Sequence, residues 1–248
     1  MTDMKKLLPI AAVLLLAQAC NSFKTSIYED DLVMPLAEQS ADSLFYSASL
    51  EYVSGGLKPH VPGVINSTIL QQAFDLEDGD GVSVEETANR YREDLIDEYL
   101  NENSEPGMPG LLTWEDRIEG CFAGIYKDWI NYQLSYYNFR GGAHGIQTVS
   151  HIVFDKNTGE TVTEDNIFTG DYKEAIAALL REAATASIKA DAPELVELLD
   201  LPSISPNGNF SVSQNGIEWT FQPYEVGPFA LGIVTAQLSW SQLKPYLK

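Results

Sequence analysis

Apolar and polar residues alternate along several stretches of the chain, and this period of two predicts β-strands. In the first such stretch, apolar or aromatic side chains occupy every second position from Leu44 to Tyr52, with serines and a glutamate among the residues between them. A hairpin is expected around Asn215-Gly216, a dipeptide that favours tight turns. The predicted strands cover residues 44–52, 112–126, 129–140, 147–154, 160–163, 209–213, 216–221 and 234–240.

Gaps of three and four between apolar residues predict the helices. Ser83 and Glu86 form a capping box at the start of the most regular pattern, and Asp171 with Glu174 is expected to cap a second long helix. The predicted helices cover residues 64–74, 83–99, 171–183 and 193–199. Because strands and helices come in blocks without regular alternation, we expect an α+β fold, with an antiparallel β-sheet packed by two longer helices and by short helices.

Residues 1–20 have the anatomy of an export signal. Lys5 and Lys6 precede an apolar run from Leu7 to Ala17, which is too short to cross a hydrocarbon core of roughly 30 Å as a permanent helix. A basic start, a short apolar segment and a small-residue end are typical of a cleaved secretory signal. The mature chain is therefore expected outside the cytoplasm, in the periplasm or at the surface of a bacterial cell.

Cys20 directly follows the tripeptide Ala17-Gln18-Ala19. A small residue followed by cysteine is typical of a lipoprotein box, in which the thiol is acylated and the chain is cut before it. The same tripeptide satisfies the small-x-small rule of ordinary signal cleavage, so both peptidases have a site here. We favour lipidation of Cys20, which attaches the protein to a membrane.

Residues 21–42 have no sustained period and predict a tether. Residues 43–248 are expected to form the folded domain, either as one unit or as subdomains 43–140 and 141–248.

The chain is strongly acidic. It has 36 Asp and Glu residues against 15 Lys and Arg residues, which gives a formal net charge of −21. Such a field repels nucleic acid and anionic lipid and attracts cationic proteins, although solubility alone is the plainer reading of the acidity. With 44% hydrophobic and 10% aromatic residues, the chain can bury a core and is not intrinsically disordered.

The sequence lacks the residue patterns of metal-dependent and nucleophilic catalysis. Its three histidines are His60, His144 and His151, and none forms a short-spaced pair with another ligand. There is no Gly-x-Ser-x-Gly motif, and Cys121, in an apolar strand, is interpreted as a small core residue. A disulfide between Cys20 and Cys121 requires Cys20 to escape acylation. We therefore expect no enzyme activity, no catalytic residue, no metal and no cofactor.

An acidic turn, Asp78-Gly79-Asp80-Gly81, has a superficial likeness to a calcium-binding loop. Val82 falls where the EF-hand pattern needs a ligand, and the glycine comes too early for that pattern. A tight turn before a capped helix explains the segment better, and weak calcium binding is left open.

Two strings in the second half of the chain are the strongest candidates for a binding surface. Gly141-Gly142-Ala143-His144-Gly145 places three glycines around one histidine, which indicates an unusual backbone shape or a close approach by another group. In the segment 222–229, Pro223 and Pro228 stiffen a loop that carries Tyr224 and Phe229, and rigid aromatic loops suit partner recognition. The structural alternatives are a kink between two strands for His144 and a plug at the end of the sheet for the aromatic residues.

These strings, taken in order, resemble a known family. The residues that carry the resemblance are the Gly141–Gly145 string, the turn Phe154-Asp155-x-x-Thr158-Gly159, Gln222-Pro223-Tyr224-Glu225, and Trp240-Ser241-x-Leu243-x-x-Tyr246-Leu247. The family is that of the extracellular domain of the RsiV anti-sigma factors, which also occurs beside a peptidoglycan deacetylase domain and in stand-alone envelope lipoproteins. The resemblance covers residues 43–247 and implies an α+β domain that, in the anti-sigma factors, is a receptor for lysozyme. This chain has neither an anti-sigma segment nor a deacetylase domain, so only a binding module is implied. The residues expected to contact the partner are those of the two candidate loops: His144, Pro223, Tyr224, Pro228 and Phe229.

Overall fold

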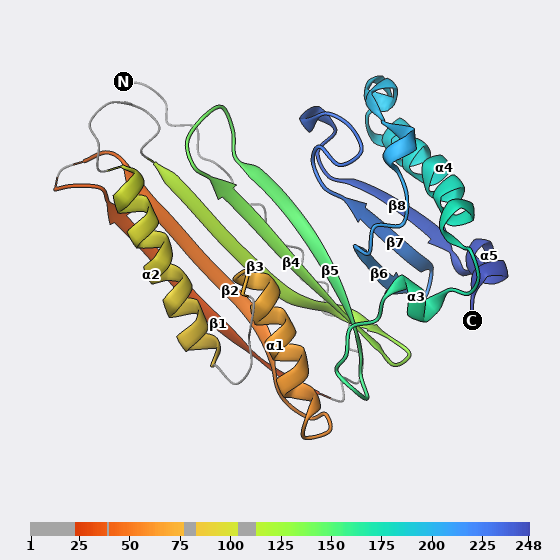
Figure 1. Cartoon of the computed structure of the whole chain (residues 1–248), viewed down its shortest axis with the longest axis horizontal. Coiled ribbons are helices and arrows are strands. Elements are labelled where there is room, and N and C mark those ends of the chain that lie inside the picture. The colour runs from red at the N-terminus through yellow and green to blue at the C-terminus, as the bar shows by residue number, and fades with distance from the viewer. Residues whose placement is uncertain (1–22, 39, 77–82, 104–112) are drawn as a thin grey trace.

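The computed structural model of the chain describes residues 23–38, 40–76, 83–103 and 113–248. These residues form one sheet of five strands and one of three, with helices packed against both (Figure 1). The prediction of an α+β fold is thus confirmed. Within these ranges, no helix has both the length and the apolarity needed to cross a membrane.

The larger sheet has its strands in chain order. They are β1 (Lys24–Pro35), β2 (Ser43–Gly55), β3 (Trp114–Tyr126), β4 (Trp129–Phe139) and β5 (Ile146–Asp155). All neighbouring strands are antiparallel except β2 and β3, which are parallel. The chain passes from one to the other through the helices α1 (Val61–Ala73) and α2 (Val84–Glu102), because parallel strands cannot be joined by a tight turn and need a crossover connection. The sheet is therefore mixed, and not purely antiparallel as the sequence predicted.

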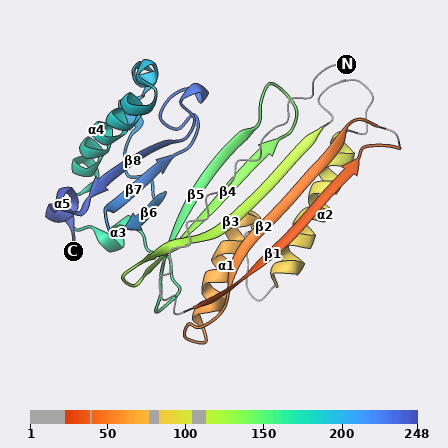
Figure 2. The same ribbon diagram turned by 180° about the vertical axis from the view of Figure 1, so that it is seen from behind.

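Both helices lie on one face of this sheet, as the views from the front and from behind show (Figures 1 and 2). The capping box that the sequence predicted is present at the start of α2, where Ser83 accepts a hydrogen bond from the backbone of Glu86 and Glu86 accepts one in return. The alternating apolar residues of β2 and β4 face the helices and are fully buried there, Leu50 and Ile130 among them.

The second half of the chain builds a smaller unit beside the first. Its elements are α3 (Glu164–Ile167), α4 (Lys173–Asp191), β6 (Phe210–Ser213), β7 (Gly216–Phe221), β8 (Val234–Ser239) and α5 (Trp240–Leu243), with short 3-10 helices at Pro193–Leu198, Leu201–Ser203, Phe229–Leu231 and Lys244–Tyr246. The strands form the antiparallel sheet β6-β7-β8, with α4 running alongside it (Figure 1). The expected cap at Asp171 is wrong, because the helix begins one residue later, after Tyr172, without a side-chain cap.

Each unit has its own hydrophobic core, and the two cores meet at β5. Ile152 and Phe154 point into the core beneath α1 and α2, whereas Val153 between them points into the core of the smaller unit. The two cores therefore share the strand β5.

Side-chain amides join the two units. Asn131 of β4 donates to the carbonyl oxygen of Val212 at 2.9 Å and accepts from the Val212 N–H at 2.7 Å. Asn209 donates to the carbonyl oxygen of Val149 and accepts from the N–H of His151, both in β5. Each side-chain amide thus presents one hydrogen-bond donor and one acceptor to a backbone, as a neighbouring strand does. The outer edge of β5 is therefore hydrogen-bonded although no sixth strand pairs with it there.

Part of the expected tether is an ordered edge strand. The segment 24–35 pairs with β2 along its whole length as β1. Its inward-facing residues include Tyr28, Asp30 and Leu32, and the carboxylate in this row breaks the apolar alternation that would have predicted a strand. Arg92 of α2 neutralises Asp30 at 2.6 Å, so the helix supplies the charge that lets an aspartate take an inward position. The signal segment with Cys20, and the acidic turn Asp78–Gly81, lie outside the described residues.

Candidate functional site

The glycine-histidine string forms the loop between β4 and β5. Gly141 and Gly142 have φ angles of 82° and 100°, in the left-handed region that L side chains rarely adopt, so the loop shape depends on glycine here. At Gly145 the reason for glycine is space, because a Cβ atom would lie 2.5 Å from the ring of Tyr137. Between these positions His144 is exposed, with its Nδ1 3.1 Å from the carbonyl oxygen of Gly145.

The second string forms a tight turn in the loop between β7 and β8. The N–H of Glu225 donates to the carbonyl oxygen of Gln222 at 3.0 Å, with Pro223 and Tyr224 at the two central positions. Tyr224 has φ +71°, which the third position of a type II turn requires and which normally selects glycine or asparagine. A tyrosine held in this conformation is strained by about 1–3 kcal/mol, and this residue is nevertheless 58% exposed.

The fold brings these two strings into contact. The rings of His144 and Phe229 are stacked, with centroids 3.9 Å apart and planes inclined by 16°. Tyr224 lies against the other side chain of its own loop, with 5.6 Å between its ring centroid and that of Phe229. We refer to His144, Tyr224 and Phe229 as the aromatic loop cluster. It joins residues that are more than seventy positions apart in the sequence.

Both predicted prolines belong to the frame of this cluster. Pro223 fixes the second position of the turn, where its φ is already suitable. Pro228 begins the 3-10 helix Phe229–Leu231, and its carbonyl oxygen accepts from the N–H of Leu231. The prolines therefore hold the loop, while the aromatic rings carry its exposed surface.

Sequence reasoning missed the two residues that anchor the loop. Gln222 pairs through its side-chain amide with both backbone groups of Val149 in β5, at 3.0 and 2.6 Å. Glu225 accepts from the N–H of Gln222 and from the side chain of Asn207, each at 2.7 Å. Gln222 thus fastens the loop to the edge of the larger sheet, and Glu225 closes the turn and ties it to Asn207.

The remaining candidate residues lie elsewhere. Cys121 is exposed on β3, which corrects its interpretation as a core residue, because the strand turns this position away from α1 and α2. Desolvation and the carboxylates of Glu51 and Glu119 raise the pKa of the Cys121 thiol, which lowers its reactivity at neutral pH. His151 is half-buried in β5, and this burial lowers its pKa. In the parts of the chain that the structure describes, no group of three or more His, Cys, Asp and Glu residues is arranged to hold a metal ion.

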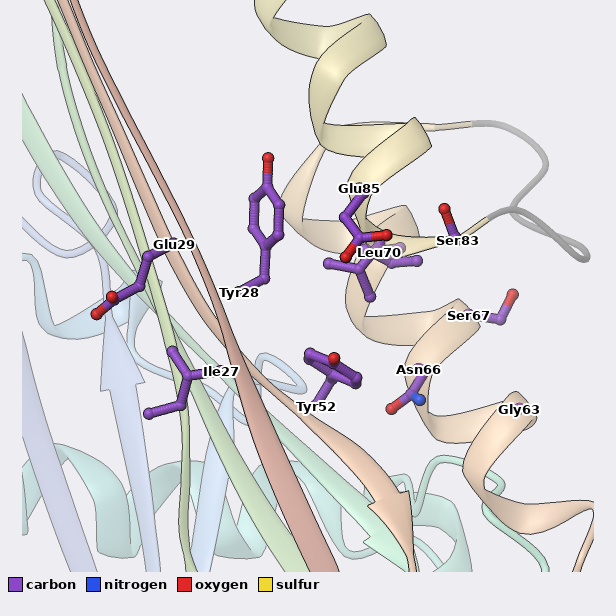
Figure 3. Close-up of a pocket in the computed structure, with 11 residues that line it drawn as sticks. Ile27, Tyr28, Glu29, Tyr52, Gly63, Asn66, Ser67, Leu70, Ser83 and Glu85 are labelled. Atoms are coloured by element: carbon purple, nitrogen blue, oxygen red, sulfur yellow. The ribbon is translucent and has the colours of Figure 1, made fainter.

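A second surface feature lies at the opposite edge of the larger sheet. A groove of about 730 Å³ lies between β1 and β2 on one side and residues 63–70 of α1 and the first turn of α2 on the other. Tyr28 and Tyr52 project from the strands into this groove, and Leu70 and Glu85 project from the helices (Figure 3). No sequence motif predicted this groove, because the residues that line it come from four separate segments of the chain.

Comparison with known proteins places the fold. Residues 165–241 match a family model described as a protein of unknown function, DUF3298. The chain is similar to this family over these residues, which are less than half of its length. The matched stretch runs from α3 into α5, so it includes the loop with Tyr224 and Phe229 but not His144. A search of curated proteins finds no match.

Two solved structures resemble nearly the whole chain. A DUF3298 family member from Bacteroides fragilis superimposes with a TM-score of 0.78 and 21% sequence identity, covering 92% of this chain and 95% of the other. A DUF3298 family protein from Pseudomonas aeruginosa gives a TM-score of 0.67 and 14% identity, with the same coverage of 92% and 95%. At these identities the likeness shows a shared fold that includes both units, and it does not assign an activity.

Proposed function

We propose that this chain is an exported envelope lipoprotein whose domain is a protein-binding module without enzyme activity, and that its partner is lysozyme or a related cell-wall-active protein. The observation that carries the proposal is the aromatic loop cluster. His144 from one loop and Phe229 from another stack at 3.9 Å, and Tyr224 extends the same surface into solvent.

The construction of the cluster supports recognition of a protein surface. Aromatic side chains on loops that are already ordered bury a large area on binding and lose little conformational entropy. The backbone at Tyr224 is strained, yet the ring makes few internal contacts for so large a side chain, as its 58% exposure shows. Strain at an exposed residue favours a functional reason for that residue over a structural one.

Charge and family resemblance support the choice of partner. A net charge of −21 speeds the approach of a cationic protein, and lysozyme is the ligand of the RsiV-type domains that the sequence resembles. Lipidation of Cys20 would hold the module at the membrane, where wall-active proteins arrive. The other candidate is an envelope accessory protein with a structural or assembly role and no affinity for lysozyme.

The test is surface binding kinetics against lysozyme with two variants of the cluster. Tyr224→Gly removes the ring and relieves the strain of the positive φ, so we expect a melting temperature no lower than that of the wild type. We expect each of Tyr224→Gly and Phe229→Ala to weaken binding by about 2 kcal/mol, mainly through faster dissociation, because a central aromatic contact is lost. Higher salt should slow association more than it speeds release.

Phe45→Ala is the matched control, since Phe45 is another partly exposed aromatic residue but lies on β2, outside the cluster. This variant should bind as the wild type does. Unchanged dissociation in a well-folded Tyr224→Gly variant would exclude the cluster as the contact surface. Absence of any lysozyme binding by the wild type would instead favour the accessory role.

A further inference from the structure

Strand β1 is the edge of the larger sheet opposite to the aromatic loop cluster. It pairs with β2 on one side, and within the described residues no backbone bond reaches it from the other side. The strand is twelve residues long and regular from Thr25 to Pro35. Long regular edges are usually shortened, bulged or covered, because their free N–H and C=O groups pair readily with another chain.

The register shows which backbone groups are free. The side chain of Asn66 binds both the N–H and the C=O of Val53 at 2.9 Å, at a point where β2 has run past its pairing with β3. The N–H and C=O of Val53 therefore face away from β1. Thr25 is paired with Val53, so its N–H and C=O face away from β2. Every second residue after Thr25 shares this orientation, so Ile27 and Glu29 present their N–H and C=O groups at the edge.

Those two residues line the groove beside Tyr28. Figure 3 shows Tyr28 and Tyr52 pointing from the sheet toward the helices, with Glu85 reaching from the first turn of α2 toward the same space. The hydroxyl of Tyr28 donates to Asp30 at 3.3 Å, which helps to hold the ring in place. A chain that paired with the edge would thus place its alternate side chains beside two tyrosine rings and a carboxylate, an environment that suits an ammonium or guanidinium group.

The charges of β1 select between a second copy of this chain and a cationic partner. Glu29, Asp30 and Asp31 follow one another in the middle of the strand, with Asp30 on the same face as Tyr28 and with Glu29 and Asp31 on the opposite face. Arg92 pairs with Asp30 alone. Antiparallel pairing of two copies about this centre would place carboxylates directly opposite one another, which is destabilising. A strand with lysine or arginine on the groove face would instead bring positive charge beside Glu85 and the two tyrosine rings.

We propose that the β1 edge and its groove bind an extended segment of a partner protein that carries lysine or arginine at alternate positions, added to the larger sheet as a further strand. Backbone hydrogen bonds to Ile27 and Glu29 supply the pairing, and the tyrosine-lined groove selects the cationic side chains. This inference does not rest on the proposed function, because the edge and the aromatic loop cluster share no residue.

The probe is a fluorescent peptide of about ten residues that alternates lysine and threonine, a length that matches one strand. The full chain should bind it, and amide hydrogen exchange should slow at Ile27 and Glu29 in the complex. Ile27→Pro should weaken binding by about tenfold or more, because proline removes an outward N–H without breaking a bond between β1 and β2. Ile27→Thr is the matched control, since it keeps the N–H and a strand-favouring side chain, and it should bind as the wild type does.

Two further variants test the groove. Glu85→Gln should weaken binding of the lysine peptide, whereas Asp191→Asn, at an exposed carboxylate on the last turn of α4, should not. A peptide with glutamate in place of lysine should not bind. Binding that survives Ile27→Pro, or that leaves the β1 amides unprotected, would overturn the proposal. Self-association of the wild type that Ile27→Pro abolishes, without binding of the lysine peptide, would overturn it in favour of a second copy.

Discussion

At the scale of single residues, Asp116 of the larger unit is a buried carboxylate that three side chains stabilise. This residue is 2% exposed, and its carboxylate accepts hydrogen bonds from Tyr91, Asn138 and Arg140. Arg140 also lies over the ring of Trp114, with its Cζ 4.5 Å from the centroid. This residue immediately precedes the glycine-histidine loop, so the same side chain that neutralises a buried charge also fixes the end of β4 from which His144 is displayed.

We predict that Arg140→Met lowers the free energy of unfolding by about 3–5 kcal/mol, because it leaves Asp116 as a buried charge without its cationic partner. The measurement is urea denaturation followed by tryptophan fluorescence. Arg181→Met is the matched control: Arg181 pairs with Glu174, whose side chain is 82% exposed, and an exposed pair contributes about 0–1 kcal/mol. Equal losses of unfolding free energy in the two variants would show that the buried pair of Arg140 and Asp116 contributes no more to stability than the exposed pair of Arg181 and Glu174.

At the scale of elements, side-chain amides take the place of missing strands. Asn66 continues the edge of β2 beyond β3, Asn131 joins β4 to β6, and Asn209 and Gln222 close the outer edge of β5. An amide suits this purpose because it carries one donor group and one acceptor in the arrangement of a peptide. The sequence showed these residues only as polar positions near strands, since the backbone that each one pairs with lies elsewhere in the chain.

Asn131→Ala tests this arrangement. The substitution leaves the buried N–H and C=O of Val212 without partners, and each such group costs about 1–3 kcal/mol, so we expect a loss of about 2–4 kcal/mol of folding free energy. Asn157→Ala, at an exposed turn, is the control and should change stability by less than about 0.5 kcal/mol. A neutral effect of Asn131→Ala would mean that packing of the two cores, and not the amide, holds the units together.

At the scale of the whole molecule, the binding proposals place two surfaces at opposite edges of one sheet. The aromatic loop cluster lies beyond β5, and the groove lies beside β1. If a lipid at Cys20 attaches the chain to a membrane, both surfaces act on partners that reach that membrane, and the net charge of −21 favours cationic ones.

The anchor is tested by Cys20→Ala in cells. The wild type should enter the detergent phase on partitioning, whereas the variant should remain in the aqueous phase, because ordinary cleavage after Ala19 stays open to it. Metabolic labelling with a fatty-acid analogue should mark the wild type and not the variant. If both proteins partition into the aqueous phase, Cys20 is not acylated.

The sequence by itself determined the elements that follow from local chemistry. The alternation in β2 and β4, the hairpin around Asn215-Gly216 and the capping box of Ser83 and Glu86 each depend on residues a few positions apart, and all are present. Periodicity failed for β1, because its inward aspartate is tolerated only through Arg92, sixty-two positions away. The α+β class followed from the order of the elements, whereas the parallel pairing of β2 and β3 depended on the path of the helical crossover.

Only the tertiary structure decided which candidate residues lie together. His144 and Phe229 were predicted as separate contact residues, and their stacking depends on Gln222 and Asn209 binding the edge of β5. The groove beside β1 had no local signature, since it is formed by the space between packed elements. Periodic patterns in the sequence reflect interactions between residues that are close in the chain. A binding surface is assembled from distant segments, whose placement is set by side-chain packing and by hydrogen bonds between backbones, and the sequence pattern contains neither.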